Sequence, residues 1–336
     1  MAFDPIAFTR ALVDVESITG NEAACGELLA RELSTLGMTV NRVPIKDGRF
    51  NVLATFPAAP QPEVYLSTHF DTVPPFIPSR EDAENIYGRG SCDAKGIIAA
   101  MTAAALRLHE QKKDVGLLFL AGEEQGSEGA KVANEQAREL HGGKCRFLIN
   151  GEPTESKMAI ASKGTLRAIV TASGKMAHSA YPHLGESAIE KLVQALERLR
   201  TMPLPSDSEI GPCTMNIGMI SGGRAPNVIP DHAEAQALYR LIGPSDELKK
   251  SVVETVGDLA KVNFYLELPF MRFATVDGIP TMIAAFTTDI PFLGNWGKPV
   301  LFGPGSIHVA HTDREFISKK ELLAAVETYM SMAKSL

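Results

Sequence analysis

The sequence predicts an α/β protein with a mostly parallel central sheet flanked by helices, into which a smaller α+β domain is inserted. In residues 1–160, short apolar strands alternate with helices, which is typical of a parallel sheet covered on both faces. The pattern changes after residue 160, where two strand–helix–strand halves are expected. We therefore expect a discontinuous larger domain of residues 1–160 and 271–336, and an inserted domain of residues 161–270.

The elements of the larger domain follow from hydrophobic periodicity. Helical periodicity covers residues 4–18 and 21–36, and Gly37 ends the second of these helices. The remaining elements are a helix of small residues and two further helices, with apolar strands between them. The helices are expected at 95–110, 127–140 and 319–335, and the strands at 39–43, 50–56, 63–69, 115–122 and 145–151.

The inserted domain is expected to be a compact α+β unit of ferredoxin-like type, with one helix in each half. Its strands are expected at 165–174, 213–220, 233–241 and 262–268, and its amphipathic helices at 186–202 and 245–261.

Composition excludes several classes of protein. The 336 residues suffice for two cores, and a net charge of −7 without a basic stripe argues against nucleic acid as a partner. No apolar segment reaches the ~18 residues of a membrane span. The N-terminal residues lack the basic and apolar regions of a secretory signal. Four scattered cysteines without a CxxC pair favour reduced thiols, so we expect a cytoplasmic protein.

Acidic and histidine side chains follow several predicted strands, where ligands gather in an open parallel sheet. One glycine-flanked turn, "GRGSCDAKG", adds a further acid before a helix. The residues are His69 and Asp71, Glu123 and Glu124, Glu152, Asp93 in that turn, and His308 and His311 near the C-terminus. Imidazole and carboxylate suit zinc, cobalt or manganese, and a carboxylate can bridge two such ions.

Each of these features also has a simpler interpretation. A His-x-Asp pair alone is usually a structural hydrogen bond, and Glu123-Glu124 alone is usually a solvated turn. The "GRGSCDAKG" turn lacks the spacing of a phosphate loop, and "HEQKK" at 109–113 lacks the second histidine of a zincin. The metal interpretation is favoured because five such features share one rim of the sheet.

Five motifs, in this order, resemble those of the co-catalytic zinc metallopeptidases and amidohydrolases. They are "STHFDTVPP", "GRGSCDAKG", "AGEEQGSEGA", "NGEPT" and "AHTDREF". That superfamily includes acetylornithine deacetylase, succinyl-diaminopimelate desuccinylase, the aminoacylases and the glutamate carboxypeptidases. The resemblance spans essentially the whole chain and implies a phosphorylase/aminopeptidase-like catalytic domain with an inserted lid or dimerisation domain.

The resemblance implies a role for each of these residues. Two Zn²⁺ ions per subunit would share Asp93, with Co²⁺ or Mn²⁺ as substitutes. His69 and Glu152 would bind the first ion, and Glu124 and His311 the second. Asp71 would orient the His69 ring, and Glu123 would be the general base on a zinc-bridging water. A cis peptide bond is implied at Asp93-Ala94.

The inserted domain is similar to segments that bind substrate in that superfamily. In "GKMAHSAYPHLGESA", His178 would reach the active site of a partner subunit in a homodimer and stabilise the oxyanion; the alternative is a histidine that caps a surface turn. Asn227 and Arg240 are candidates for binding the substrate carboxylate, although Arg240 could equally be an exposed strand end. Gly303 and Gly305 of "FGPG" would bring backbone close to the substrate.

We therefore expect hydrolysis of an amide bond next to a carboxylate, in a small N-acyl amino acid or a peptide. Glutamate at 152 resembles the deacylase and carboxypeptidase members, whereas the aminopeptidase branch usually has aspartate there. Two alternatives stay open at this point. One is an aminopeptidase or dipeptidase of the same superfamily, and the other is a non-catalytic binding protein on the same scaffold.

Overall fold

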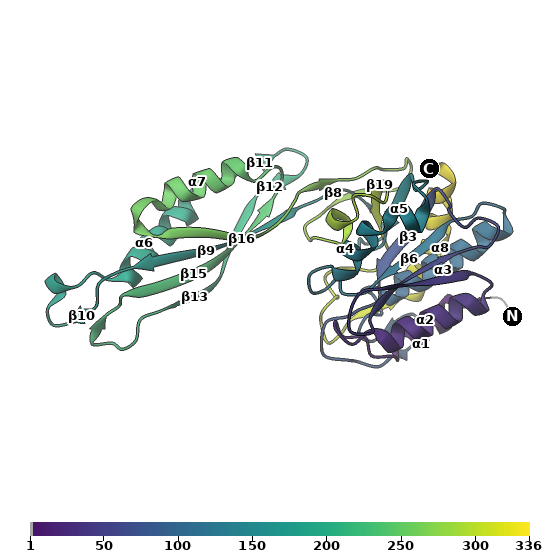
Figure 1. Cartoon of the computed structure of the whole chain (residues 1–336), viewed down its shortest axis with the longest axis horizontal. Helices are drawn as coiled ribbons and strands as arrows, with labels where there is room; N and C mark the ends of the chain where they lie inside the picture. The colour runs from purple at the N-terminus through teal and green to yellow at the C-terminus, as the bar shows by residue number, and fades with distance from the viewer. Residues whose placement is uncertain (1–2) are drawn as a thin grey trace. The chain divides into compact units, whose positions relative to one another are not determined.

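The structure, a computed structural model, describes residues 3–336, which form two compact units (Figure 1). Of the described residues, the first unit comprises 3–160, Phe273–Met282 and Thr288–Leu336, and the second comprises Ala161–Arg272 and Ile283–Thr287. Within residues 3–336, none of the helices is long and apolar enough to cross a membrane.

The first unit is built on a central sheet with the strand order β1-β2-β6-β3-β7-β19-β8. Its strands in chain order are β1 (Thr39–Pro44), β2 (Phe50–Thr55), β3 (Val64–His69), β6 (Gly116–Leu120), β7 (Phe147–Asn150), β8 (Met158–Ser162) and β19 (Lys298–Phe302). The pairs β6–β3, β3–β7 and β7–β19 are parallel. The pairs β1–β2, β2–β6 and β19–β8 are antiparallel.

The prediction of a mostly parallel sheet is therefore wrong, because the sheet is mixed. Only the central strands are parallel, and antiparallel strands flank them on both sides. Residues 45–49 join β1 to β2, and such a short connection permits only an antiparallel hairpin. Buried strands are apolar throughout in either direction, so their composition did not reveal the direction of β2, and the strand β8 was not predicted.

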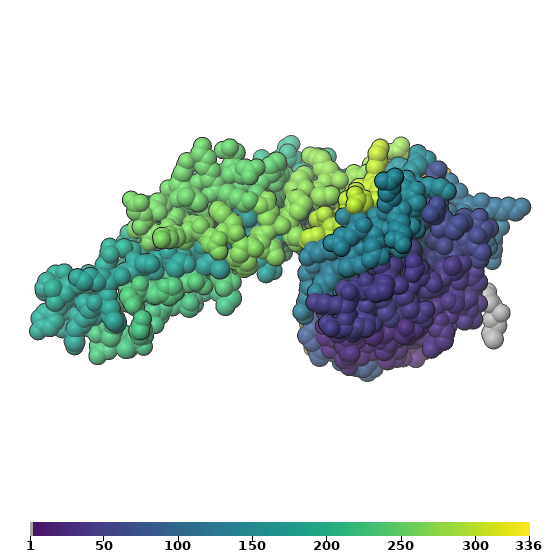
Figure 2. Space-filling model, viewed as in Figure 1, coloured from purple at the N-terminus to yellow at the C-terminus, as the bar shows by residue number. Residues whose placement is uncertain are grey.

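Helices cover both faces of this sheet, as the apolar strands predicted. Helices α1 (Pro5–Val13), α2 (Ala23–Thr35), α3 (Lys95–Glu110) and α8 (Lys319–Ser335) contribute to the larger core on one face. Helices α4 (Glu128–Glu135) and α5 (Ala137–His141) contribute to a smaller core on the other. Side chains of β3 alternate between them: Leu66 lies in the larger core and Tyr65 in the smaller. Figure 2 shows, in purple, the outer surface of the N-terminal segment.

Smaller elements complete the first unit. A three-stranded sheet has the order β20-β5-β4, and its strand β20 leads directly into α8. Its strands are β4 (Arg80–Glu81), β5 (Asn85–Tyr87) and β20 (Phe316–Ser318), and a 3-10 turn, η3, spans Ile290–Phe292.

The second unit has the element order β–α–β–β–α–β of a ferredoxin-like fold. These elements are β9 (Gly164–Ser173), α6 (Ala188–Thr201), β13 (Thr214–Gly222), β15 (His232–Leu241), α7 (Asp246–Val256) and β16 (Lys261–Leu268). The sheet is antiparallel, with the strand order β13-β15-β9-β16. Both helices lie on one face of it, over a core of alternate side chains such as Leu166, Val170 and Tyr239 (Figure 1).

The second unit also contains short elements, of which β17 and β18 pair with β8. They are β10 (Ala177–His178), η1 (Pro182–Leu184), β11 (Ser206–Asp207), β12 (Gly211–Pro212), β14 (Val228–Ile229), η2 (Gly257–Leu259) and β17 (Met271–Arg272), and β18 (Thr281–Ala284) contributes its last residues.

Several predicted helices end earlier in the structure. The helix predicted at 4–18 ends at Val13, and the buried Lys95 ammonium donates to the carbonyls of Leu12 and Val15, at 3.0 and 2.8 Å. The helix predicted at 127–140 is interrupted at Gln136 and becomes α4 and α5. The helix predicted at 245–261 ends at Val256, because Gly257 has a φ of 55°.

Candidate metal centre

His69 and Asp71 lie where β3 leaves the sheet, as the sequence predicted. Every residue of β3 is buried, and His69 is only 1% exposed. Its Nδ1 lies 3.1 Å from the backbone oxygen of Asp71 and 3.4 Å from the Oδ1 atom of the same residue. These contacts fix the ring so that Nε2 points away from Asp71 and toward the next acid of the site.

The Asp93 carboxylate lies between two imidazoles. Its Oδ1 is 3.0 Å from Nε2 of His69, and its Oδ2 is 3.3 Å from Nε2 of His311. The same His311 nitrogen is 2.9 Å from Oε1 of Glu124, and Oε2 of Glu152 lies 3.9 Å from His69 Nε2. The structure therefore brings together all five residues predicted as ligands. The predicted cis peptide bond at Asp93-Ala94 is present.

The chemistry of these side chains fits divalent cations. One ligand atom from each of His69, Asp93 and Glu124 lies within 4.8 Å of the others, close enough to hold one ion. Oε1 of Glu152 is buried and has no hydrogen-bond partner within residues 3–336, which is costly for a carboxylate unless a cation satisfies it. Carboxylates and imidazoles without thiolate are the donors that zinc, cobalt and manganese share in hydrolytic sites.

The histidines and Asp93 hold one another in their charged forms. Hydrogen bonds to Asp93 and Glu124 raise the pKa of His311 to about 10. Burial alone would lower the pKa of His69, but its hydrogen bonds to Asp71 and Asp93 raise it well above its usual value. Burial would likewise raise the pKa of Asp93, but His311 and His69 lower it. Both shifts therefore favour protonated imidazoles beside the Asp93 carboxylate.

Glu123 and Glu152 respond in the opposite direction. Burial and the charge of Glu152 raise the pKa of Glu123 well above its usual value. Burial also raises the pKa of Glu152, with Asp93 adding to the effect. The carboxyl groups of Glu123, Glu152 and Asp93 thus share a region of low dielectric. A cation bound there would favour their ionised forms.

Asp71 does more than orient the His69 ring. Its Oδ1 accepts from the backbone N–H of Glu123 at 3.0 Å, and its Oδ2 accepts from the backbone N–H of Glu124 at 3.2 Å. The Thr19 hydroxyl donates to the same Oδ2 at 2.8 Å. One buried carboxylate therefore holds both the imidazole and the turn that carries the two adjacent glutamates.

Sequence reasoning missed Glu315, although its motif was recognised. Oε1 of Glu315 accepts from the backbone N–H groups of Cys92 and Asp93, each at 3.1 Å, and Oε2 is 2.7 Å from Nη1 of Arg89. This carboxylate therefore anchors the turn that carries the acid between the two imidazoles. The only signal in the sequence was an acid four residues after His311.

Asp289 is a further buried acid that sequence reasoning missed. It is 1% exposed, and its Oδ1 has no hydrogen-bond partner among the described residues. Burial raises the pKa of Asp289 to about 7, although the Ser127 hydroxyl opposes the shift. Nothing in "FTTDIPF" distinguishes this aspartate from one in an exposed turn.

The glycines of "FGPG" approach other backbone and side chains closely. A Cβ atom on Gly303 would lie 2.3 Å from the backbone oxygen of Glu152, and one on Gly305 would lie 2.5 Å from Sγ of Cys92. Gly305 also has a φ of 81°. Both positions therefore require glycine for packing. His308, in contrast, is an exposed residue 3.8 Å from Glu155.

The remaining candidates lie in the second unit. His178 is exposed at the end of β10, and its Nδ1 accepts from the backbone N–H of Ala180 at 3.1 Å. The backbone oxygen of Asn227 accepts from Ser179 at 3.1 Å, so His178 and Asn227 are neighbours. Arg240 is half-buried on β15 and donates to the Thr165 hydroxyl at 2.9 Å. His178 therefore does make a local turn contact, and its ring remains exposed.

Comparison with known proteins identifies relatives over nearly the whole chain. The profile of peptidase family M20/M25/M40 matches residues 65–335. A "Peptidase M20 domain-containing protein" of Schizosaccharomyces pombe is 35% identical over 97% of this chain and 83% of its own. A "Probable carboxypeptidase" of Aspergillus fumigatus is 38% identical over 98% of this chain and 86% of its own.

Solved structures with this fold include two described as peptidases. The aminopeptidase PepT of Bacillus cereus superposes with a TM-score of 0.83 at 24% identity, covering 98% of this chain and 97% of its own. The family M20 metallo-carboxypeptidase Sso-CP2 of Sulfolobus solfataricus has a TM-score of 0.75 at 16% identity, covering 99% of each chain. At these identities, the likeness concerns the fold.

Proposed function

Because the chain belongs to peptidase family M20/M25/M40, we propose that it hydrolyses an amide bond next to a free carboxylate, as a carboxypeptidase or N-acyl amino acid deacylase. The observation that carries this proposal is the position of Glu123. Its backbone is bound to the same Asp71 carboxylate that orients His69, and its neighbour Glu124 contacts His311. A candidate base is thus held beside a cluster suited to metal.

The cluster would hold two Zn²⁺ ions, with Asp93 shared between them. His69 and Glu152 would complete the binding of one ion, and Glu124 and His311 that of the other. Such a pair of ions supplies Lewis-acid polarisation of the amide carbonyl and lowers the pKa of a water molecule.

Glu123 would act first as the general base and then as the general acid in this reaction. Its carboxylate accepts the proton of the attacking water and then donates it to the nitrogen of the departing amine. Burial raises the pKa of Glu123, which favours a group that must hold a proton between these two events. Asp71 fixes the backbone of Glu123, so that the carboxylate keeps its position while its charge changes.

Three observations favour a free carboxylate in the substrate. The Aspergillus fumigatus relative carries the name "Probable carboxypeptidase", and its similarity extends over 98% of this chain. Residue 152 is glutamate, which resembles the deacylase and carboxypeptidase members. Arg240 is a half-buried guanidinium without a carboxylate partner in residues 3–336, so it is suited to bind a substrate carboxylate, with Asn227 as a second candidate.

The proposal includes a homodimer formed through the second unit, in which His178 stabilises the oxyanion in the partner's site. Support comes from exposed apolar side chains on that unit, among them Val193 at 55% and Ile220 at 61%. Light scattering and activity, both measured at the same micromolar protein concentration, test the homodimer. Full activity of a monomer would remove the role of His178 in the partner.

The main test compares Glu123→Gln with Glu124→Gln in metal-loaded enzyme. We expect Glu123→Gln to retain two metal ions per chain while kcat falls by about 10²–10⁴-fold, because only the proton acceptor is lost. Glu124→Gln should lose metal together with activity. Loss of metal in Glu123→Gln would contradict the assigned roles, and undiminished turnover would exclude Glu123 as the base.

A panel of candidate substrates tests which class of substrate the enzyme hydrolyses. N-acetyl and N-succinyl amino acids and N-blocked dipeptides offer a free carboxylate, and C-terminally amidated dipeptides with a free α-amine do not. Turnover of the first group alone supports the proposal. Turnover that requires the free α-amine would identify an aminopeptidase, and metal binding without turnover of any substrate would indicate a binding protein.

A further inference from the structure

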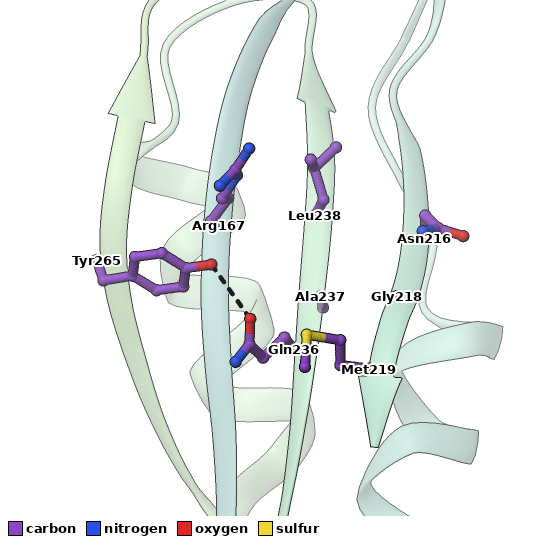
Figure 3. Close-up of a pocket in the computed structure, with 8 residues that line it drawn as sticks. All are labelled: Arg167, Asn216, Gly218, Met219, Gln236, Ala237, Leu238 and Tyr265. Carbon is purple, nitrogen blue, oxygen red and sulfur yellow. Dashed lines mark hydrogen bonds between the residues drawn. The ribbon is translucent and has the colours of Figure 1, made fainter. Parts of the chain in front are cut away.

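The sheet of the second unit has an open face with a cavity of about 200 Å³ (Figure 3). Helices α6 and α7 pack on the opposite face, so this face carries the alternate side chains of each strand. Side chains from all four strands line the cavity: Arg167 from β9, Asn216 and Met219 from β13, Gln236 and Leu238 from β15, and Tyr265 from β16. Its volume is below the ~300–1,000 Å³ of sites for drug-sized ligands and suits a molecule the size of an amino acid.

The positive charge in the cavity has no acidic side chain beside it among the lining residues. Arg167 contributes a guanidinium, and no carboxylate lines the cavity. Within residues 3–336, no carboxylate oxygen lies within 4.0 Å of a guanidinium nitrogen of Arg167. Arg240 lies on the same face, two residues along β15 from Leu238, the register partner of Arg167. Burial and the charge of Arg167 both lower the pKa of Arg240, so the two cations lie close enough to repel.

Neutral donors and apolar surface complete the lining. The Tyr265 hydroxyl donates to Oε1 of Gln236 at 3.5 Å, which leaves the Gln236 amide NH₂ as a donor. Figure 3 shows this amide between β9 and β15, with the Met219 side chain beside it. Met219 is 63% exposed, a large unprotected apolar surface for one residue. Cation and amide donors thus adjoin an apolar wall formed by Met219 and Leu238.

We propose that this cavity binds a small aliphatic carboxylate, with Arg167 holding the carboxylate and Met219 and Leu238 covering the alkyl chain. A charged acceptor would satisfy the unpaired guanidinium and relieve its repulsion with Arg240. A neutral molecule of the same shape would gain only the apolar contact. The site adjoins Arg240, the candidate for the substrate carboxylate, so this inference rests on the proposed function and extends it to a neighbouring position that needs neither metal nor a scissile bond.

The test uses 4-methylpentanoate, which has no amide bond to hydrolyse, and 4-methylpentanamide as its uncharged match. The full chain is labelled with ¹³C at the methionine methyl groups, and Met219→Leu identifies the signal of Met219 among the 12 methionines. We expect the carboxylate to shift the Met219 signal saturably, and the amide to bind at least about tenfold more weakly.

Two matched variants locate the binding. Arg167→Met should weaken binding of 4-methylpentanoate by about tenfold, since one charge-assisted contact is lost. Arg200→Met removes an exposed arginine of α6 and should leave the affinity unchanged. Equal binding of acid and amide, or unchanged affinity in a folded Arg167→Met variant, would overturn the proposal. So would a Met219 signal that shifts with protein concentration and not with ligand, because that identifies a contact between copies. Glu123→Ala should bind the carboxylate normally, which separates this result from the fate of the proposed hydrolysis.

Discussion

The carboxylate of Asp71 accepts a hydrogen bond from the backbone N–H of Glu123 at 3.0 Å. The same carboxylate contacts the ring of His69, so a candidate ligand and the candidate base depend on one buried group. Burial would raise the pKa of Asp71, but its interaction with His69 lowers it, and the group is therefore an anion that accepts hydrogen bonds on both oxygens. This explains why the turn after β6 has a fixed position although it is irregular.

Asp71→Asn should therefore affect catalysis more than folding. An amide can accept only on its oxygen, so one of the N–H groups of Glu123 and Glu124 loses its partner. Loss of such an outer contact typically costs about 10–100-fold in activity or metal affinity. Steady-state kinetics with metal analysis measures both quantities. Thr19→Val removes one donor to Asp71 and serves as the milder control; equal losses in the two variants would contradict this account.

The sequence identified part of this region because its information is local, whereas the roles of Asp93 and His311 rested on the family resemblance. His69, Asp71 and Glu152 follow strands whose apolar runs are visible in the sequence, and parallel strands bring their carboxyl ends to one edge. Glu315 could not be predicted in the same way, because it reaches Asp93 across 222 positions of the chain through a backbone contact. Strand direction was missed for the related reason that pairing partners, and not composition, determine it.

Arg89→Met tests the anchoring role of Glu315. The two side chains are 3% and 1% exposed, so the substitution leaves a buried carboxylate without its cation. Such a change typically costs about 3–5 kcal/mol of unfolding free energy. Urea denaturation provides the measurement. Arg42→Met breaks the exposed pair with Glu27 and should cost less than about 1 kcal/mol; a similar cost for both would contradict the burial argument.

Gly303→Ala tests whether close backbone packing holds Glu152 in place. The new Cβ atom would lie 2.3 Å from the Glu152 backbone oxygen, so one of the two segments must move. We expect a loss of about 1–3 kcal/mol in stability together with weaker metal binding. Gly294→Ala is the matched control, because no atom of the described part of the chain lies within 4 Å of its Cβ position. Normal metal affinity in Gly303→Ala would show that Glu152 does not depend on this contact.

Asp289→Asn should stabilise the metal-free protein at alkaline pH. Burial raises the pKa of Asp289 from 3.8 to about 7, so the unfolded chain ionises first and stability falls as pH rises through that interval. The amide avoids this cost. We expect a gain of about 2–4 kcal/mol at pH 8 and little change at pH 4, measured by urea denaturation in EDTA. The exposed Asp313→Asn is the control, and a gain independent of pH would contradict the assignment.

Metal loading should release protons at neutral pH. Hydrogen bonds to Asp93 and Glu124 raise the pKa of His311 to about 10, so without a bound cation its imidazole is protonated at pH 7 and must lose a proton before it can bind one. Burial raises the pKa of Glu152 as well, which adds to the release. Affinity for Zn²⁺ should therefore rise with pH. Calorimetry in buffers of different ionisation enthalpy counts the protons, and His311→Asn should release about one fewer. An observed enthalpy that is the same in every buffer would show that the five side chains are not charged as the structure indicates.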